Sequence, residues 1–111
     1  MKYLGPLSSA YSGTRLFYVD LSNQLDSSES LSTIDTLVCS DSDVILAGET
    51  ILSSDLTTKD GHVLSANKSI KFRAGCAVPK ETVANITIEY TTDQGNSDST
   101  ITYLKIVPSI I

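Results

Sequence analysis

The sequence predicts an all-β domain with a single core, and three of its properties lead to that prediction. The chain has 111 residues, a length that supports one hydrophobic core but not two. Its apolar residues, 41% of the total, fall in short runs of about four to six residues instead of the longer amphipathic windows of helices. Ser and Thr, which suit polar β-surfaces, make up roughly a quarter of the chain.

Residues 1–14 predict an extended N-terminal arm. Gly5, Pro6 and Gly13 interrupt this segment, and its apolar residues follow neither the helical nor the strand period. Such an arm either is flexible or is held against a neighbour through its aromatic and leucine side chains, and we favour a docked arm. The side chains in question are Tyr3, Leu4, Leu7 and Tyr11.

The next segments predict two strands and a connection. Residues 15–21 are dense in side chains that favour a pleated surface, whereas residues 22–30 are polar and rich in turn formers. In residues 31–39 the apolar positions recur every three residues, which also fits a helical turn. The β-branched residues of this segment favour a strand instead.

Three features mark the middle of the chain. An apolar run at residues 44–46 is broken by Gly48 and resumes at residues 51–52. In residues 59–62 an Asp-Gly pair supplies the positive φ angles that a tight hairpin turn requires. Residues 70–74 alternate apolar and basic side chains, which predicts a half-buried strand whose basic residues face solvent or a partner.

The strongest hairpin signal lies in residues 82–107. The first strand, residues 82–92, alternates, and we expect its inward side chains to be Ala84, Ile86, Ile88 and Tyr90. The second strand, residues 99–107, is apolar on both faces, so one face should meet the core and the other something else. Pro108 ends it because proline has no amide proton to donate.

These segments predict an immunoglobulin-like β-sandwich over residues 15–108. Its seven to eight short antiparallel strands are separated by turn signals every eight to twelve residues or so, which is typical of that architecture. The chain therefore divides into the arm, residues 1–14, and one sandwich domain.

Charge and hydropathy exclude several partner classes. The net charge is −5 and the isoelectric point about 4.5, and the eight basic residues are scattered, whereas nucleic-acid sites need a clustered basic face. We expect no nucleic-acid or membrane partner, since no stretch approaches the ~18 apolar residues of a membrane span. The N-terminus is broken by Gly5 and Pro6 before a signal-peptide core can form, so we expect a soluble chain made in the cytosol.

The sequence offers little catalytic chemistry. His62 is the single histidine and stands in a predicted turn beside Asp60, where a solvated polar role is far more common than a catalytic one. Asp41 and Asp43 occupy an exposed turn that offers no burial to separate their pKa values. Together with Asp26 and Glu29 they could in principle hold calcium, but no calcium-loop spacing is present. We therefore expect no catalytic residues, no metal and no cofactor.

The two cysteines leave two alternatives open. Cys39 and Cys76 are too far apart in sequence for a zinc motif, which needs a close pair of ligands. Reduced, partly buried thiols are the favoured alternative, because cytosolic proteins rarely keep disulfides. A bridge between two sheets is the other.

Four segments resemble a family of small tailed-phage virion proteins. Residues 18–22 (Tyr-Val-Asp-Leu-Ser) followed by Leu25 are similar to its opening strand and turn, and residues 69–75 (Ser-Ile-Lys-Phe-Arg-Ala-Gly) to the strand that runs into its glycine. Residues 84–95, closed by residues 104–107, resemble its final hairpin with a Thr-Thr-x-x-Gly turn. The chain thus resembles the immunoglobulin-like fibre-tail adaptor or accessory virion proteins of tailed bacteriophages over about residues 15–108.

This resemblance implies a non-enzymatic virion component, assembled in the host cytoplasm, that docks in many copies on capsid, neck, tail or fibre proteins as an adaptor or decoration. We expect the docking residues to be aromatic and aliphatic anchors of the arm and of the last strand. They are Tyr3, Leu4, Leu7, Tyr11, Ile101 and Tyr103. The alternative is a β-sandwich that binds a carbohydrate or host surface through exposed aromatic side chains.

Overall fold

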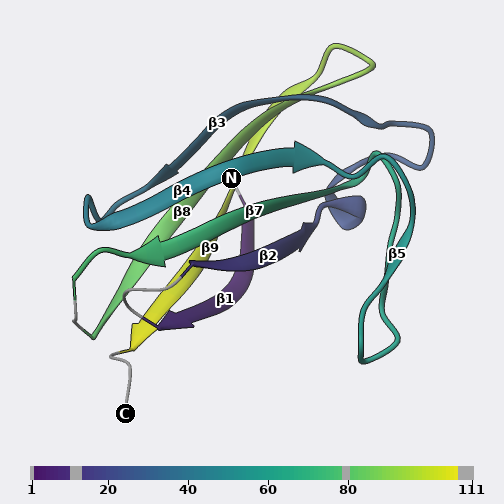
Figure 1. Ribbon diagram of the computed structural model, residues 1–111. Helices are drawn as coiled ribbons and strands as arrows, with labels where there is room; N and C mark the ends of the chain where they lie inside the picture. Colours follow the sequence, from purple (N-terminus) through teal and green to yellow (C-terminus); the bar gives the residue numbers. More distant parts are fainter. Residues whose placement is uncertain (1, 11–13, 79–80, 108–111) are drawn as a thin grey trace.

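The computed structural model describes residues 2–10, 14–78 and 81–107, and these residues form nine strands and one short 3-10 helix, η1 (Ser22–Gln24) (Figure 1). The strands are β1 (Lys2–Ala10), β2 (Thr14–Asp20), β3 (Leu31–Cys39), β4 (Val44–Ile51), β5 (Leu56–Thr57), β6 (Val63–Leu64), β7 (Ser69–Cys76), β8 (Thr82–Thr92) and β9 (Ser97–Val107). The predicted all-β fold class is confirmed. The predicted sandwich domain holds eight of these strands, β2 to β9, which agrees with the expected seven to eight, and β1 adds one from the predicted arm.

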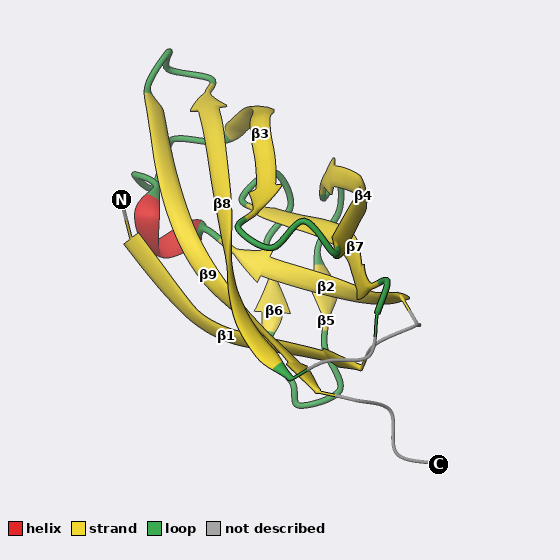
Figure 2. Ribbon diagram, turned by 90° about the vertical axis from the view of Figure 1, so that its left-hand side faces the viewer, coloured by secondary structure: helices red, strands yellow, loops and turns green. Residues whose placement is uncertain are grey.

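Two main sheets face each other across one core (Figure 2). The larger sheet has the order β1-β9-β8-β3 and the smaller sheet the order β2-β7-β4. Strands β5 and β6 form a separate hairpin in the connection between β4 and β7. The sandwich arises because each sheet has one apolar face that must be buried against the other.

The N-terminal segment contributes a strand to the larger sheet. Strand β1 pairs with β9 in parallel, with Tyr3 opposite Ile101 and Leu7 opposite Leu104. The strand pairs within the predicted sandwich are all antiparallel, as expected, whereas the segment expected to form an extended arm adds this parallel pair. The alternation typical of a strand is not visible in the sequence of β1, because Gly5 and Pro6 fall where the register shifts. Proline is tolerated there because β1 is an edge strand of its sheet.

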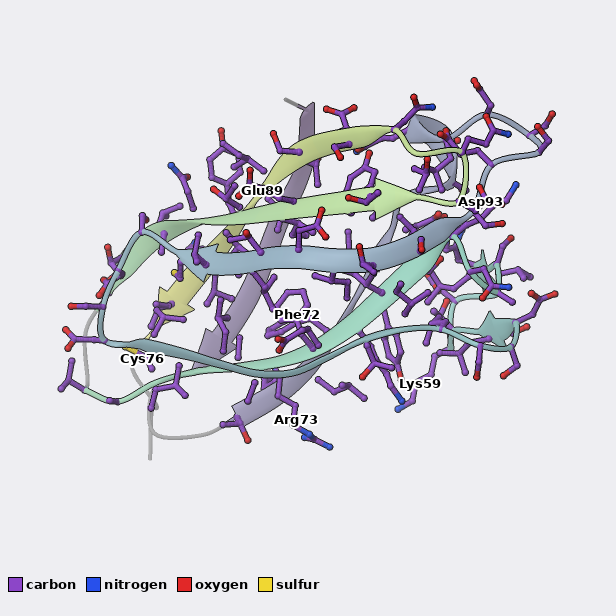
Figure 3. The ribbon with its side chains drawn as sticks, turned by 90° about the horizontal axis from the view of Figure 1, so that it is seen from above. Lys59, Phe72, Arg73, Cys76, Glu89 and Asp93 are labelled. Carbon is purple, nitrogen blue, oxygen red and sulfur yellow. The ribbon has the colours of Figure 1, made fainter. Side chains whose placement is uncertain are left out.

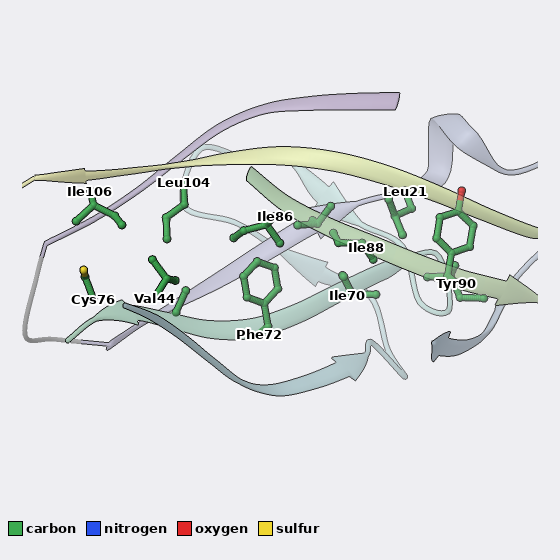
Figure 4. Close-up of a cluster of buried hydrophobic side chains, with 13 residues drawn as sticks. Leu21, Val44, Ile70, Phe72, Cys76, Ile86, Ile88, Tyr90, Leu104 and Ile106 are labelled. Carbon is green, nitrogen blue, oxygen red and sulfur yellow. The ribbon is translucent and has the colours of Figure 1, made fainter. Parts of the chain in front are cut away.

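The β8–β9 hairpin supplies much of the core, as its alternation predicts. Ala84, Ile86, Ile88 and Tyr90 are all buried, which confirms the predicted inward face. Ile86, Ile88 and Tyr90 meet Phe72 and Ile70 of β7 across the core (Figure 4). Phe72 also contacts Phe17 of β2, with ring centroids 6.0 Å apart and planes tilted by 38°.

Two register shifts explain why the apolar residues of β3 recur every three positions. Its register with β8 shifts between Leu31 and Thr33 and again between Ile34 and Thr36. Each shift inserts a residue into the strand, so Leu31, Ile34 and Leu37 all pack on the core although a regular strand would alternate by two. The choice of strand over helix is confirmed.

Strand β4 runs through the position where a break was expected. Its register with β7 shifts between Ala47 and Thr50, and Gly48 there has φ +69°. Gly48 thus allows a bulge within one strand, because L side chains rarely adopt this φ. The predicted turn at residues 59–62 joins β5 to β6, with Gly61 at φ +87° and its amide donating to the Thr58 carbonyl.

Candidate interaction surfaces

The outer face of the larger sheet presents a row of apolar side chains that polar ones interrupt, because Asn85 is opposite Tyr103 and Lys105 is opposite Val83. Val38 of β3 and Val83 of β8 are 50% and 61% exposed, and Ile101 and Tyr103 of β9 are half-buried. The strand registers place Val38 opposite Thr87 and Thr87 opposite Ile101, so these residues are direct cross-strand neighbours. We call Val38, Val83, Thr87, Ile101 and Tyr103 the larger-sheet face.

Two of the predicted docking residues, Tyr3 and Ile101, are cross-strand partners in this sheet, and three others lie on the same two strands. Ile101 and Tyr103 belong to the larger-sheet face, and the backbone of Tyr3 pairs with that of Ile101. Pro6 pairs with Tyr103 in the same way. Three predicted arm residues belong to β1, namely Tyr3, Leu4 and Leu7. Tyr11 lies outside the described residues.

The outer face of the smaller sheet combines apolar and basic side chains. Leu16 of β2 is opposite Arg73 of β7, and Tyr18 is opposite Lys71. Ile45 of β4 is 56% exposed and Leu16 39% exposed. We call Leu16, Tyr18, Ile45, Lys71 and Arg73 the smaller-sheet face. Sequence alternation predicted that its basic residues point outward, but it did not show that apolar residues of β2 and β4 flank them.

His62 pairs with a different carboxylate from the one beside it in sequence. Its Nε2 lies 2.9 Å from Oδ2 of Asp20 at the end of β2, and its side chain is 56% exposed. Asp60 instead accepts a hydrogen bond from the Thr58 hydroxyl. Because Asp20 stands 42 positions away, no local sequence signal could have found this pair.

Asp20 also orders the start of η1, and this arrangement is unlike a catalytic triad. The Ser22 hydroxyl donates to Oδ1 of Asp20 over 2.6 Å, so the carboxylate binds both the serine and the histidine. A nucleophilic serine would have to donate to the histidine instead. Partial burial raises the pKa of Asp20, but the hydrogen bonds from Ser22 and His62 outweigh it and hold the pKa below its ordinary value.

Glu29 anchors a polar cluster at the loop end of the sandwich. Its carboxylate is buried, and Oε2 accepts hydrogen bonds from the Thr92 hydroxyl at 2.7 Å and the Asn96 amide at 2.8 Å. The Asp26 amide donates to Oε1. Chiefly through Asn96 and then Thr92, these bonds lower the pKa of Glu29. Sequence analysis considered Glu29 only as a calcium ligand and missed this structural role.

The four candidate calcium ligands do not come together. Asp41 accepts the Asp43 amide in the turn between β3 and β4, while the Asp43 carbonyl accepts the amide of Ala77 just after β7. Glu29 instead binds Asn96 of the β8–β9 loop. Asp93 of that loop lies at the opposite end of the sandwich from Cys76 (Figure 3). Within the described residues no group of three or more metal-ligating side chains gathers.

An open, acidic hollow lies beside the apolar row of the larger sheet. Its volume is about 360 Å³, and its lining includes the carboxylates of Asp35, Glu89 and Asp98. Asp35 accepts hydrogen bonds from the hydroxyls of Thr91 and Thr33, which together lower its pKa. No lysine or arginine is among the described residues that line the hollow.

Both cysteines are free thiols. Cys76 is buried in the core, and Cys39 packs against the same core while remaining partly accessible. Burial raises the pKa of Cys39. A thiol of raised pKa is mostly protonated at neutral pH and therefore a poor nucleophile.

No model of a known protein family matches the chain, and no curated protein matches it significantly. In the part of the chain that the structure describes, no helix is long and apolar enough to span a membrane.

Proposed function

We propose that this chain is a non-enzymatic structural component of a tailed-phage virion, an immunoglobulin-like module that docks on capsid, neck or tail proteins as an adaptor or decoration. The observation that carries the docking function is the larger-sheet face, where Val38, Val83, Ile101 and Tyr103 are wholly or partly exposed on one surface. The phage assignment is supported by the sequence resemblance over residues 15–108.

The order of the strands supports the immunoglobulin-like assignment. If the β5–β6 hairpin is treated as an insertion, the other seven strands take the letters A to G in chain order. The smaller sheet then reads B-E-D, and β9-β8-β3 reads G-F-C, which is the strand order of immunoglobulin sandwiches. Strand A departs from the constant-type order, because β1 pairs with β9 instead of joining β2.

An apolar surface of this kind favours a protein partner. Aromatic and aliphatic side chains supply most of the binding energy at protein interfaces when they become buried, and Tyr103 and Ile101 are of that type. They lie on strands of the sandwich, so binding them would require little ordering of the chain. A protein partner would remove Val38 and Val83 from water as well.

The aromatic residues give less support to the alternative, a carbohydrate-binding module. The Tyr90 ring is buried, and Phe17 packs against Phe72 in the core. Tyr18 and Tyr103 lie on opposite outer faces of the sandwich, so they do not form one platform for a sugar ring.

The proposal is tested by incorporation into particles of a phage whose genome encodes the chain. Tagged wild-type chain and the variant Ile101→Ser/Tyr103→Ser would be supplied during infection, and the copy number in purified particles would be measured by quantitative mass spectrometry. We expect the wild-type chain to be retained and the variant to fall by about tenfold, which corresponds to a loss of about 1.4 kcal/mol.

Val63→Ser is the matched control, because Val63 is an exposed valine on the separate β5–β6 hairpin. It should incorporate like the wild-type chain. Circular dichroism and thermal unfolding of each variant check that the fold is kept. Absence of the wild-type chain from the particles would overturn the virion role, and full incorporation of the double variant would overturn the docking face. Binding of the free chain to a glycan array would instead favour the alternative.

A further inference from the structure

The two outer faces of the sandwich differ in charge: the smaller sheet presents Lys71 and Arg73, whereas the larger sheet presents the carboxylates of Glu89 and Asp35 together with Lys105, which is opposite Val83. Arg73 projects from one side of the molecule and Glu89 from the other, with the core residue Phe72 between them (Figure 3). Both charged side chains are exposed. The charged residues that sum to −5 are therefore unevenly distributed, and one surface is basic although the chain as a whole is acidic.

The basic surface is the smaller-sheet face. Lys71 and Arg73 stand two positions apart on the central strand β7, so they point the same way. Neither makes a hydrogen bond or ion pair with any described residue. Leu16 and Tyr18 are their cross-strand neighbours on β2, so charge and apolar area are combined on one surface.

The acidic surface is the hollow of the larger sheet. Glu89 is two positions from Thr87 on β8 and pairs with Ser99, which is two positions from Ile101 on β9. The acidic hollow and the apolar row are thus adjacent on one sheet. The hollow is open to solvent and has a volume of about 360 Å³, so a side chain of another molecule can enter it.

We propose that the partner of the smaller-sheet face is a second copy of this chain, whose larger-sheet face it contacts. Arg73 and Lys71 of one copy would lie against the carboxylates of Glu89 and Asp35 of the next, and Leu16 would meet the apolar row. Two smaller-sheet faces would repel each other, as would two acidic hollows, so the attractive contact is head-to-tail. Such a contact generates a ring where it closes and a filament where it does not.

This inference rests on the docking function proposed above and identifies the virion protein that the larger-sheet face contacts as a neighbouring copy of this chain, but its test needs only the purified chain. Sedimentation velocity would be recorded for the full chain over a range of concentrations. We expect reversible association that weakens as the salt concentration rises from about 0.05 M to about 0.5 M, because salt screens exposed charges.

Charge-swap variants supply the specific test. Arg73→Glu and Glu89→Lys should each weaken association by about tenfold or more, since each puts like charges in contact. The double variant Arg73→Glu/Glu89→Lys keeps the net charge of the wild-type chain and should restore association. Lys59→Glu is the control for net charge: Lys59 is exposed in the β5–β6 turn, and its reversal should leave association unchanged.

Two results would overturn the second-copy proposal. One is a wild-type chain that remains monomeric at all concentrations. The other is a double variant that associates no better than the single variants. If the chain is monomeric and Arg73→Glu nevertheless reduces particle incorporation, the basic face docks on a different virion protein, and the proposed function stands without this inference.

Discussion

The two ends of the sandwich core are closed in different ways. At one end, aliphatic and thiol side chains from both sheets meet, including Val44, Cys76, Leu104 and Ile106 (Figure 4). At the other end, hydrogen-bonded polar side chains cover the core. Glu29 there binds Thr92 and Asn96. We call these the apolar end and the polar end.

A single strand shows the change from one end to the other. The inward residues of β9 are Leu104 and Ile106 toward the apolar end but Thr100 and Thr102 toward the polar end, and all four are buried. The loop that contains η1 reaches this part of the core, where the Gln24 amide donates to the Thr100 hydroxyl. A loop brings backbone and polar side chains with it, so the strand it covers must supply hydrogen-bonding partners.

The largest effect should come from a cavity at the centre of the core. Phe72 is fully buried and contacts Phe17, so we expect Phe72→Ala to lower the free energy of unfolding by about 3–5 kcal/mol. Urea unfolding followed by circular dichroism measures it. Phe72→Leu leaves a smaller cavity and serves if the alanine variant does not fold. A loss below about 1 kcal/mol for the alanine variant would mean that packing at this point contributes little.

A smaller loss is expected when the polar end loses one hydroxyl. Thr92→Val keeps the shape of the side chain but removes a donor to the buried Glu29 carboxylate, and we expect a loss of about 1–3 kcal/mol. Thr91→Val is the matched control, because Thr91 makes a similar bond to Asp35 on the outer face. Equal effects of the two variants in urea unfolding would show that burial of the polar end is irrelevant.

The polar end should also be the more sensitive to acid. The pKa of Glu29 lies below its ordinary value of 4.5 in the folded chain, so the stabilisation is fully present above about pH 4.5 and is lost as the pH falls through the folded pKa. Urea midpoints should therefore fall as the pH is lowered below about 4.5.

Thr92→Val should make this drop shallower, because removing a hydrogen bond moves the pKa of Glu29 back toward its ordinary value. The outer-face carboxylate of Asp35 also has a lowered pKa and contributes to the acid sensitivity of both proteins. The difference between the two pH profiles therefore isolates Glu29. Superimposable profiles would contradict this assignment.

The smallest effect on stability should follow the removal of a buried hydroxyl that has no hydrogen-bond partner among the described residues. Ser69 at the start of β7 is fully buried, and its Oγ has no hydrogen-bond partner among the described residues. Ser69→Ala should leave thermal stability unchanged or raise it slightly, because a buried unpaired hydroxyl is itself destabilising. A clear fall in the melting temperature would show that the Ser69 hydroxyl contributes to the stability of the folded chain.

Alternation made most of the sandwich predictable. The hairpin of β8 and β9 was identified with its inward residues, and Ile101 and Tyr103 of the candidate docking face could be named from apolar side chains on both faces of one strand. Bulges obscured the rest. The two register shifts of β3 mimic a helical spacing, and the shift at Gly48 in β4 resembles a break. A bulge changes which residue points inward without leaving a clear signal in the sequence.

The sequence by itself determined the fold class, the inward face of the central hairpin and the outward direction of Lys71 and Arg73. Each of these depends on the two-residue period of a strand, which is a local property. Only the tertiary structure decided the parallel pairing of β1 with β9, the Asp20–His62 contact and the hydrogen bond from Asn96 to the buried Glu29. It also placed the basic surface and the acidic hollow on opposite sides of the sandwich. These features join residues that are far apart in the chain, and the pairing of distant strands and the packing of sheets and loops determine which of them meet.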